Sequence, residues 1–229
     1  MDMDHFKMHV DPGPGAIVRM KETGLDPMKT DALFISHRHP DHCSDAEIMI
    51  VAMTAGKKEL AGSIFGSQSA LDGVKGESPS ISEYLQGKLL HRQAMFSGDA
   101  VSTGRCTITA KPAYHSDPST VGFTLTDGIF TLGYLPDTEY HSSLCAEYSG
   151  CDVLVLSLTR PKGDRISYHL CTQDAKKLIL GAKPKRAILT HFGERMIRWG
   201  PQKEAAYLHE ETGINVIAAK DGEIVKIER

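Results

Sequence analysis

Residues 36–45 read SHRHPDHCSD and directly follow the apolar run ALFI at 32–35. Three histidines and an aspartate fall within six positions, namely His37, His39, Asp41 and His42. These four side chains can each bind a metal ion, and they lie where a hydrophobic strand is expected to end. A solvated polar loop can have the same composition, so the rest of the sequence has to distinguish such a loop from half of a metal site.

The spacing within this stretch favours a metal site. Residues i and i+2 of an extended segment point the same way, so His37 and His39 can bind one ion together. Pro40 disfavours helical geometry at His39. Asp41 and His42 then begin the next helix, where they can face a second ion. A catalytic zinc site needs about three protein ligands and an open position, so more ligands are expected at the ends of other strands.

Four further candidates have this placement. Each follows an apolar run and precedes a loop or a helix: His115 after TITAKPAY, Asp137 after IFTLGYLP, His169 within ISYHL, and His191 after AILT. A single histidine after a strand is more often a structural or surface residue, but four repeats of one layout indicate a common site. The other histidines, among them His5 and His209, lack this placement and are interpreted as structural or surface residues.

Length and composition are those of a globular protein. The 229 residues fit one large domain or two small ones, and we expect a single domain over residues 1–229. Hydrophobic residues make up 41% and charged residues 24%, which is ordinary for such a protein. A net charge of -3 disfavours a broad nucleic-acid interface. Two short basic runs, RPKGDR at 160–165 and KPKR at 183–186, are of a kind that usually forms solvated loops.

Cysteine usage and hydropathy favour a cytoplasmic protein. The five cysteines form an odd, scattered set without a C-x-x-C pair, which suits a reducing compartment better than a disulfide framework. The segment MDMDHFKMHV has no apolar stretch typical of a signal peptide. No apolar run reaches the ~18–20 residues of a membrane span. We therefore expect a soluble cytoplasmic chain without a membrane partner.

Hydrophobic periodicity predicts a mixed α/β fold. Strands are expected at 6–10, 32–35, 63–65, 89–96, 106–110, 122–126, 129–132, 153–157, 187–190, 215–217 and 223–227. Helices are expected at 16–23, 45–55, 138–147, 172–180 and 202–212, and the Ser- and Gly-rich segment 66–87 is expected to be mainly a loop. Strand–helix–strand units lie at both ends of the chain and hairpin-like strands lie in the middle.

The order of these motifs resembles the metallo-β-lactamase superfamily. HRHPDH matches its H-x-H-x-D-H signature, and VDPGPG with Asp11 resembles the Asp-x-Gly turn that precedes it. AYHS and YLPDT resemble the segments that carry the third histidine and the bridging aspartate. SYHLCTQDA and LTHFGER resemble the last two histidine motifs of the tRNase Z-like branch. Six ordered matches over nearly the whole chain are far more specific than one short motif.

The resemblance implies a fold and a role for each matched residue. The fold is an αββα sandwich of two mixed sheets with helices outside. The first ion would be bound by His37, His39 and His115, and the second by Asp41, His42 and His191, with Asp137 bridging both. His169 corresponds to a proton donor for the leaving group, and Arg195 to an arginine after the last ligand. Asp11 would contact the metal-binding residues without binding an ion itself. Asp41 would also orient the attacking water.

The ligand types favour hydrolysis. Imidazole and carboxylate without thiolate suit two zinc ions, and also manganese or iron. Two ions ~3.5–4 Å apart can hold a bridging hydroxide and polarise a phosphoryl or carbonyl oxygen. The oxygen-reducing di-iron members of the superfamily have a glutamate where this chain has His39. We therefore predict a dinuclear metal-dependent hydrolase of phosphodiesterase type with a small phosphoester substrate.

Other functions stay open at this point. A thioester or lactone hydrolase of the same fold is the first alternative, because the phosphodiesterase prediction depends on His169 and Arg195. A tRNA 3′-processing endonuclease is disfavoured, since no Gly- and Pro-rich basic arm for clamping tRNA is evident. A non-catalytic metal-binding or sensor protein would keep the site without turnover. The resemblance also allows a homodimer, and it leaves open whether the first sheet has its usual edge strand before VDPGPG.

Overall fold

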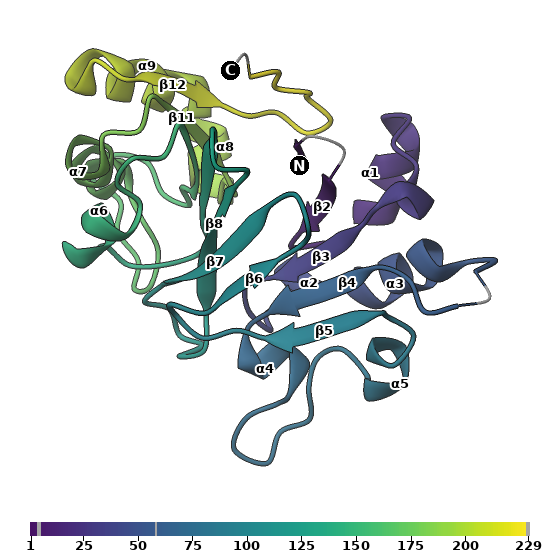
Figure 1. The fold of residues 1–229 in the computed structure, drawn as a ribbon. Helices are drawn as coiled ribbons and strands as arrows, with labels where there is room; N and C mark the ends of the chain where they lie inside the picture. Colours follow the sequence, from purple (N-terminus) through teal and green to yellow (C-terminus); the bar gives the residue numbers. More distant parts are fainter. Residues whose placement is uncertain (4–5, 58, 228–229) are drawn as a thin grey trace. The chain divides into compact units, whose positions relative to one another are not determined.

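The structure, a computed structural model, describes residues 1–3, 6–57 and 59–227 (Figure 1). His5, interpreted above as a structural or surface residue, lies outside the described residues. The chain divides into two compact units, Met1–Phe96 with Ser119–Val121 and Ser97–Pro118 with Gly122–Arg229. Each unit is built on one mixed sheet with its helices. The expectation of one domain over residues 1–229 stays a prediction.

The sheet of the first unit has the strand order β1-β2-β3-β4-β5 (Figure 1). Its strands are β1 (Asp2–Met3), β2 (Phe6–Val10), β3 (Ala32–Ile35), β4 (Ser63–Gly66) and β5 (His91–Ala94). β2 to β5 run parallel, and β1 pairs antiparallel with β2. All four residues of the central strand β3 are buried, which explains why its sequence is a continuous apolar run. β1 supplies an edge strand before β2, the point that the sequence left open.

Helices of the first unit bury one side of this sheet. They are α1 (Ala16–Glu22), the 3₁₀ helix η1 (Pro27–Lys29), α2 (Pro40–Cys43), α3 (Ala46–Thr54), α4 (Gln68–Leu71) and α5 (Glu83–Gln86). Met49, Ile50 and Met53 of α3 lie in the same fully buried apolar cluster as Leu33 and Ile35 of β3. This packing fixes the two ends of the loop that carries the histidine motif.

His9 on β2 makes the first unit sensitive to acid. Burial lowers the pKa of His9 from 6.5 to about 4, against the opposing charges of Asp11 and Asp45. Between these values the unfolded chain binds a proton that the folded chain does not, so the free energy of unfolding falls as the pH drops from 6.5 towards 4. The loss from this group is at most about 3.5 kcal/mol, at ~1.4 kcal/mol per pKa unit.

The variant His9→Gln is therefore expected to lose less stability on acidification than the wild type. Urea unfolding at about pH 7 and about pH 4.5 measures the difference. His91→Gln, at an exposed position on β5, is the matched control and is expected to follow the wild-type curve. An unchanged acid dependence in His9→Gln would contradict the assignment.

The sheet of the second unit has the order β12-β11-β10-β9-β8-β7-β6. Its strands are β6 (Ala100–Ser102), β7 (Thr107–Pro112), β8 (Val121–Thr126), β9 (Thr131–Leu135), β10 (Val153–Ser157), β11 (Arg186–Thr190) and β12 (Asn215–Ala218). β9 to β12 are parallel to one another, whereas β8 pairs antiparallel with β9 and β6 antiparallel with β7. The carboxyl ends of β9, β10 and β11 therefore lie at one edge.

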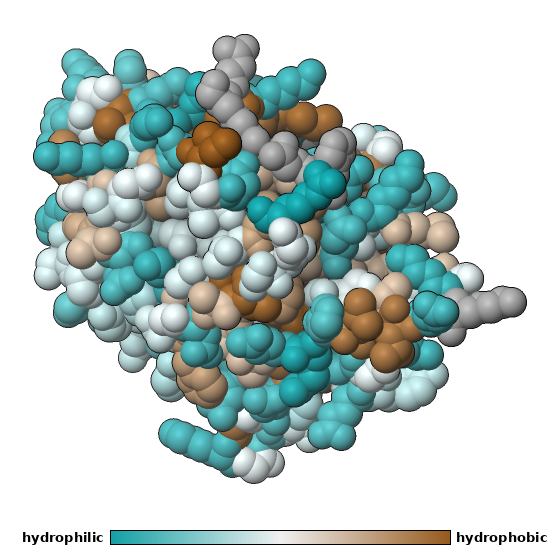
Figure 2. Space-filling view, in the orientation of Figure 1, coloured by the Kyte–Doolittle hydropathy of each residue, from teal (hydrophilic) through white to brown (hydrophobic). Residues whose placement is uncertain are grey.

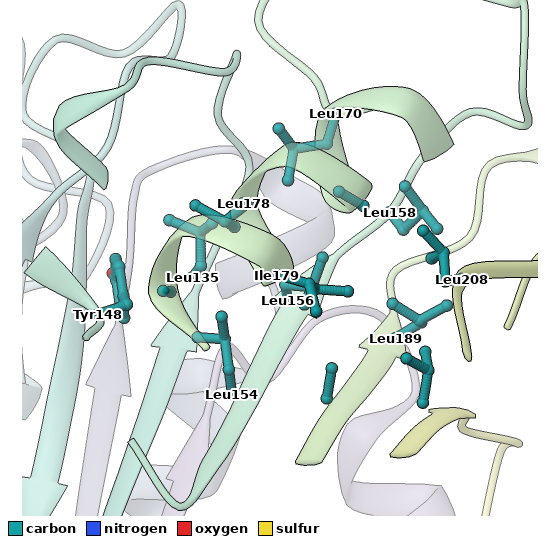
Figure 3. Packing of buried hydrophobic residues seen from close by; sticks show 14 of the residues in the cluster. Leu135, Tyr148, Leu154, Leu156, Leu158, Leu170, Leu178, Ile179, Leu189 and Leu208 are labelled. Carbon is teal, nitrogen blue, oxygen red and sulfur yellow. The ribbon is translucent and has the colours of Figure 1, made fainter. Parts of the chain in front are cut away.

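A leucine-rich core joins this sheet to its helices. The helices are α6 (Ser143–Glu147), α7 (Thr172–Ala182), α8 (Glu194–Trp199) and α9 (Pro201–Thr212), and α7 packs against both α6 and α9. Figure 3 shows Leu178 and Ile179 of α7 gathered with Leu154 and Leu156 of β10. All four side chains are fully buried, so α7 is firmly seated on the strands that end at the candidate site.

Several predicted elements differ from the structure. The strand predicted at 223–227 is wrong, because these residues have no regular structure. The helix predicted at 138–147 begins only at Ser143, and the strand predicted at 89–96 is shortened to His91–Ala94. The predicted loop at 66–87 contains α4 and α5, and α8 was missed. Periodicity reports apolar spacing but not whether a segment finds a partner strand, which explains the error at 223–227.

On the face shown in Figure 2, hydrophilic residues predominate and hydrophobic residues form small separate groups. Exposed apolar side chains, such as those of Ile129 and Ile197, are normal on a protein surface. Within the described part of the chain, no helix combines the length and the apolar character that crossing a bilayer requires.

Candidate active site

The histidine motif of the first unit begins directly after β3. Ser36 and His37 are fully buried. His39 has extended backbone angles, φ -64° and ψ 141°, and precedes α2, whose first residue is Pro40. The predicted change from extended to helical backbone at Pro40 is thus confirmed. It leaves His42 buried within α2, while the Asp41 side chain is 60% exposed and can reach solvent.

Asp11 organises this motif through three contacts. Its Oδ1 accepts a hydrogen bond from the Ser36 backbone N–H at 2.6 Å, and its Oδ2 accepts one from Ser36 Oγ at 2.6 Å. The same Oδ2 lies 3.0 Å from Nδ1 of His42. Burial raises the pKa of Asp11, but the hydrogen bonds from His42 and Ser36 outweigh it and hold the pKa below its ordinary value. The ionised carboxylate therefore accepts a hydrogen bond from Nδ1–H of His42, which leaves Nε2 as the atom that can bind a metal ion.

His37 and His39 present their nitrogens to one point. Nε2 of His37 and Nδ1 of His39 are 3.0 Å apart, while Nδ1 of His37 lies 2.9 Å from Ser36 Oγ. Two nitrogens bound to one tetrahedral zinc ion lie roughly 3.3 Å apart, as Zn–N bonds of ~2.0–2.1 Å dictate. The spacing of this pair fits a shared divalent ion.

The turn DPGPG at 11–15 holds the motif in place by close backbone contact. A Cβ atom on Gly13 would lie 2.0 Å from the carbonyl oxygen of Asp41, so only glycine permits this approach. The Asp45 backbone N–H also donates to the Pro12 carbonyl at 2.9 Å. The turn therefore sets the position of α2 and of the two ligand candidates on it.

Asp137 is the centre of the histidine cluster in the second unit. It follows β9 and is 2% exposed. Its Oδ1 lies 3.2 Å from Nδ1 of His191, which follows β11, and its Oδ2 lies 3.3 Å from Nε2 of His169. His191 has a left-handed backbone with φ 57°. The edge formed by the ends of β9 and β11 thus brings a carboxylate and two imidazoles together.

His115 is oriented by the backbone carbonyl of a residue with an unusual backbone conformation, Tyr168. Its Nδ1 lies 3.0 Å from the carbonyl oxygen of Tyr168, where the ring donates its proton. Tyr168 has φ 64°, which is unusual for a bulky residue and costs of order 1 kcal/mol. With Nδ1 bonded in this way, Nε2 of His115 faces the cluster. His115, Asp137 and His169 each offer a ligand atom, and these atoms lie within 4.8 Å of one another.

The environment of His169 favours its protonated form. The contact with Asp137 raises the pKa of His169 above its ordinary value, against an opposing effect of burial, and a hydrogen bond from Nδ1 to the Ser167 carbonyl at 2.9 Å adds to the rise. The side chain is 22% exposed, so it can meet a substrate. These properties suit the predicted proton donor. Sequence reasoning did not group His169 with His115 and Asp137 as metal ligands, although the geometry allows it.

Arg195 lies in the first turn of α8 and contacts a residue that sequence reasoning missed. Its NH1 group donates to both carboxylate oxygens of Asp164 at 3.3 Å. Asp164 belongs to the basic run RPKGDR, which was interpreted as a solvated loop. The signal that could have found it is this run itself, because a lone carboxylate among three cations has an evident electrostatic partner.

The donor set fits a divalent metal ion. In His37, His42 and His115, Nδ1 is held by an outer group, respectively Ser36 Oγ, the Asp11 carboxylate and the Tyr168 carbonyl. Metal-binding histidines show this arrangement, which fixes the ring and leaves Nε2 for the ion. The first unit brings together Asp11, His37, His39, Asp41 and His42, and the second unit His115, Asp137, His169 and His191. The assignment of ligands to individual ions stays a prediction.

Sequence comparison identifies relatives over most of the chain. A family model for the β-lactamase superfamily domain matches residues 7–192. The uncharacterized protein MJ1374 of Methanocaldococcus jannaschii is 40% identical over 221 residues, which cover 96% of this chain and 82% of that protein.

Three solved structures share the fold of this chain. The metallo-β-lactamase fold protein YhfI from Bacillus subtilis matches with a TM-score of 0.78 at 20% identity. The match covers 97% of this chain and 88% of the YhfI chain. A diphosphatase of the PhnP family has a TM-score of 0.71 at 16% identity, covering 99% and 82%. The short form of human tRNase Z has a TM-score of 0.71 at 15% identity, covering 100% and 91%. These likenesses confirm the predicted αββα fold class.

Proposed function

The chain belongs to the β-lactamase superfamily of metal-dependent hydrolases, and on that premise we propose that it is a dinuclear phosphodiesterase acting on a small phosphoester. The observation that carries the proposal is the placement of His169, whose partly exposed ring reaches Oδ2 of the buried Asp137 with Nε2 at 3.3 Å. A protonated histidine beside the reacting centre can give its proton to the departing oxygen of a phosphoester.

The proposal assigns the ligands as the superfamily resemblance implies. One ion would be held by His37, His39 and His115, and the other by Asp41, His42 and His191, and Asp137 would serve both. When bound, the two divalent ions supply Lewis acidity, which lowers the pKa of water and polarises a phosphoryl oxygen. Nitrogen and carboxylate ligands suit zinc first, and manganese or iron as well.

Three residues of the chain then have distinct tasks. The exposed carboxylate of Asp41 accepts a hydrogen bond from the attacking water and orients it towards phosphorus. Nε2 of His169 donates its proton to the ester oxygen as the P–O bond breaks, so that the product leaves as a neutral alcohol. Arg195 offers guanidinium N–H groups to the anionic phosphoryl oxygens. Two of the solved structures named above, a diphosphatase and a tRNase, lend support to a phosphoester substrate.

Metal-loaded protein is expected to hydrolyse bis(4-nitrophenyl) phosphate and to leave thioesters and lactones intact. Release of nitrophenolate, of thiol and of acid measures the three reactions side by side. Turnover of thioester or lactone substrates alone would overturn the proposal and favour the carbonyl-hydrolase alternative.

The likeness to tRNase Z makes tRNA 3′ processing a second candidate. The net charge of -3 weakens it, because binding to an RNA backbone depends on cationic side chains. Cleavage of pre-tRNA at low salt, where such binding is strongest, would establish this candidate, and its absence would remove it. A cytoplasmic location is part of the proposal and is supported by the five free cysteines; a homodimer stays a prediction.

A further inference from the structure

The basic run at 160–165 of the second unit is held in place by hydrogen bonds from its backbone to side chains of two helices. Two side chains from other helices accept hydrogen bonds from its backbone: Glu204 Oε2 from the N–H of Lys162 at 3.3 Å, and Gln173 Oε1 from that of Gly163 at 3.0 Å. Glu204 is 4% exposed, so the first anchor is buried. These anchors fix the residue that follows, Asp164, in one place.

Asp164 holds two arginines at once. Arg160 NH1 donates to Asp164 Oδ2 at 3.2 Å, and Arg195 NH1 lies 3.3 Å from both carboxylate oxygens. We name Arg160, Asp164 and Arg195 the arginine clamp. The Arg160 and Asp164 side chains are 21% and 23% exposed, whereas Arg195 is 70% exposed. Two guanidinium groups share one carboxylate, which leaves the clamp with a surplus positive charge and further N–H donors for an anion.

The arginine clamp lies beside the proton donor. The Arg160 backbone N–H donates to the Leu170 carbonyl at 3.3 Å, and Arg160 forms a parallel bridge with Cys171. The chain at Arg160 therefore runs next to the segment that follows His169. The Gly193 N–H donates to the Thr159 carbonyl at 3.2 Å, which ties the start of α8 to the same place. The backbone of Arg160 therefore runs beside the segment that follows His169, and the start of α8, which carries Arg195, is tied to the neighbouring residue Thr159.

We propose that Arg160 and Arg195 bind the anionic phosphoryl oxygens of the phosphoester substrate, and that Asp164 is the positioning residue that holds both guanidinium groups for this purpose. The inference rests on the proposed function and extends it to two residues outside the ligand motifs. A phosphodiester carries one negative charge, which matches the surplus charge of the clamp. Without the carboxylate the two cations repel each other, and a substrate has to order them itself.

The variant Asp164→Asn is expected to raise KM for bis(4-nitrophenyl) phosphate roughly 10-fold and to change kcat little, because the clamp binds substrate and transition state alike. The matched control is Glu194→Gln, which removes the carboxylate of the exposed Glu194–Arg198 ion pair on the same helix as Arg195. The control is expected to keep the wild-type KM. An unchanged KM in Asp164→Asn would overturn the proposal.

Arg160→Lys and Arg195→Lys provide a second line of test that does not depend on Asp164→Asn folding well. Each keeps the charge but loses the planar pair of donors, so each is expected to raise KM for the diester. Thermal unfolding shows whether each variant is folded. Wild-type KM in both lysine variants would also overturn the proposal.

A binding experiment separates failure of the clamp from failure of the proposed function. If the wild type does not hydrolyse the diester, the proposed function has failed, and inorganic phosphate is titrated into zinc-loaded, ¹⁵N-arginine-labelled protein. The Nε–H resonances of Arg160 and Arg195, assigned from the lysine variants, are expected to shift in the wild type and in Glu194→Gln, and much less in Asp164→Asn. Resonances that do not shift in the wild type would overturn the inference on its own.

Discussion

Asp137→Asn is expected to lower phosphodiester hydrolysis by roughly 10³-fold or more, since the metal ions contribute several kcal/mol and each 1.4 kcal/mol is tenfold in rate. Metal content is expected to fall with it. Asp137 is buried and contacts both His169 and His191, and in the proposal it would be a ligand of both ions. An amide keeps the shape of the side chain but not its charge, so neither ion is held as before.

Metal analysis of protein purified without added metal checks this prediction. The wild type is expected to hold two ions per chain and the variant less than about one. Asp152→Asn is the matched control, because Asp152 is a partly buried carboxylate of the same unit that binds Lys185 and the Thr131 N–H. Full metal content in Asp137→Asn would show that Asp137 only orients the two histidines and is not a ligand.

The sequence predicted the strands that lead to the candidate site for a clear physical reason. β3 is apolar throughout, and β10 and β11 are apolar over most of their length, because both faces of a central strand are buried. A polar metal-binding residue directly after such a strand is easily recognised. His37 and His191 were found in this way. Spacing could not assign roles, and the distinction between His169 as proton donor and His115 as ligand came from family resemblance.

Contacts between distant segments could not be predicted from the sequence. The Tyr168 carbonyl that orients His115 is separated from it by 53 positions, and the left-handed backbone of Tyr168 has no local signal. Arg160 lies four positions before Asp164 in the run RPKGDR, but Arg195 meets this carboxylate only through the packing of residues 158–160 against 190–193. A residue's charge is visible in the sequence, but its partner is visible only after folding.

His169→Ala is expected to lower kcat by about 10²–10⁴-fold for phosphodiesters with a poor leaving group, because a general acid contributes that much. For an ester that releases 4-nitrophenolate the loss is expected to be far smaller, since this anion departs without a proton. A series of methyl aryl phosphates with phenol and nitrophenol leaving groups measures the difference. His209→Ala, at an exposed position on α9, is the matched control.

The pH profile gives a second measure of the same role. In the metal-free protein the contact with Asp137 raises the pKa of His169, and the profile of the metal-loaded enzyme measures the pKa at which this group acts. Hydrolysis of the phenyl ester is expected to decline only as the pH rises through that pKa, and the decline is expected to vanish in His169→Ala.

Metal content then separates the two roles that the geometry allows for His169. A proton donor can be removed while both ions stay, and its loss is felt mainly by poor leaving groups. A ligand in the group of His115, Asp137 and His169 cannot be removed without loss of metal, and all substrates then suffer alike. A non-catalytic metal-binding protein would show no effect of leaving group, because it has no turnover that depends on the proton of His169.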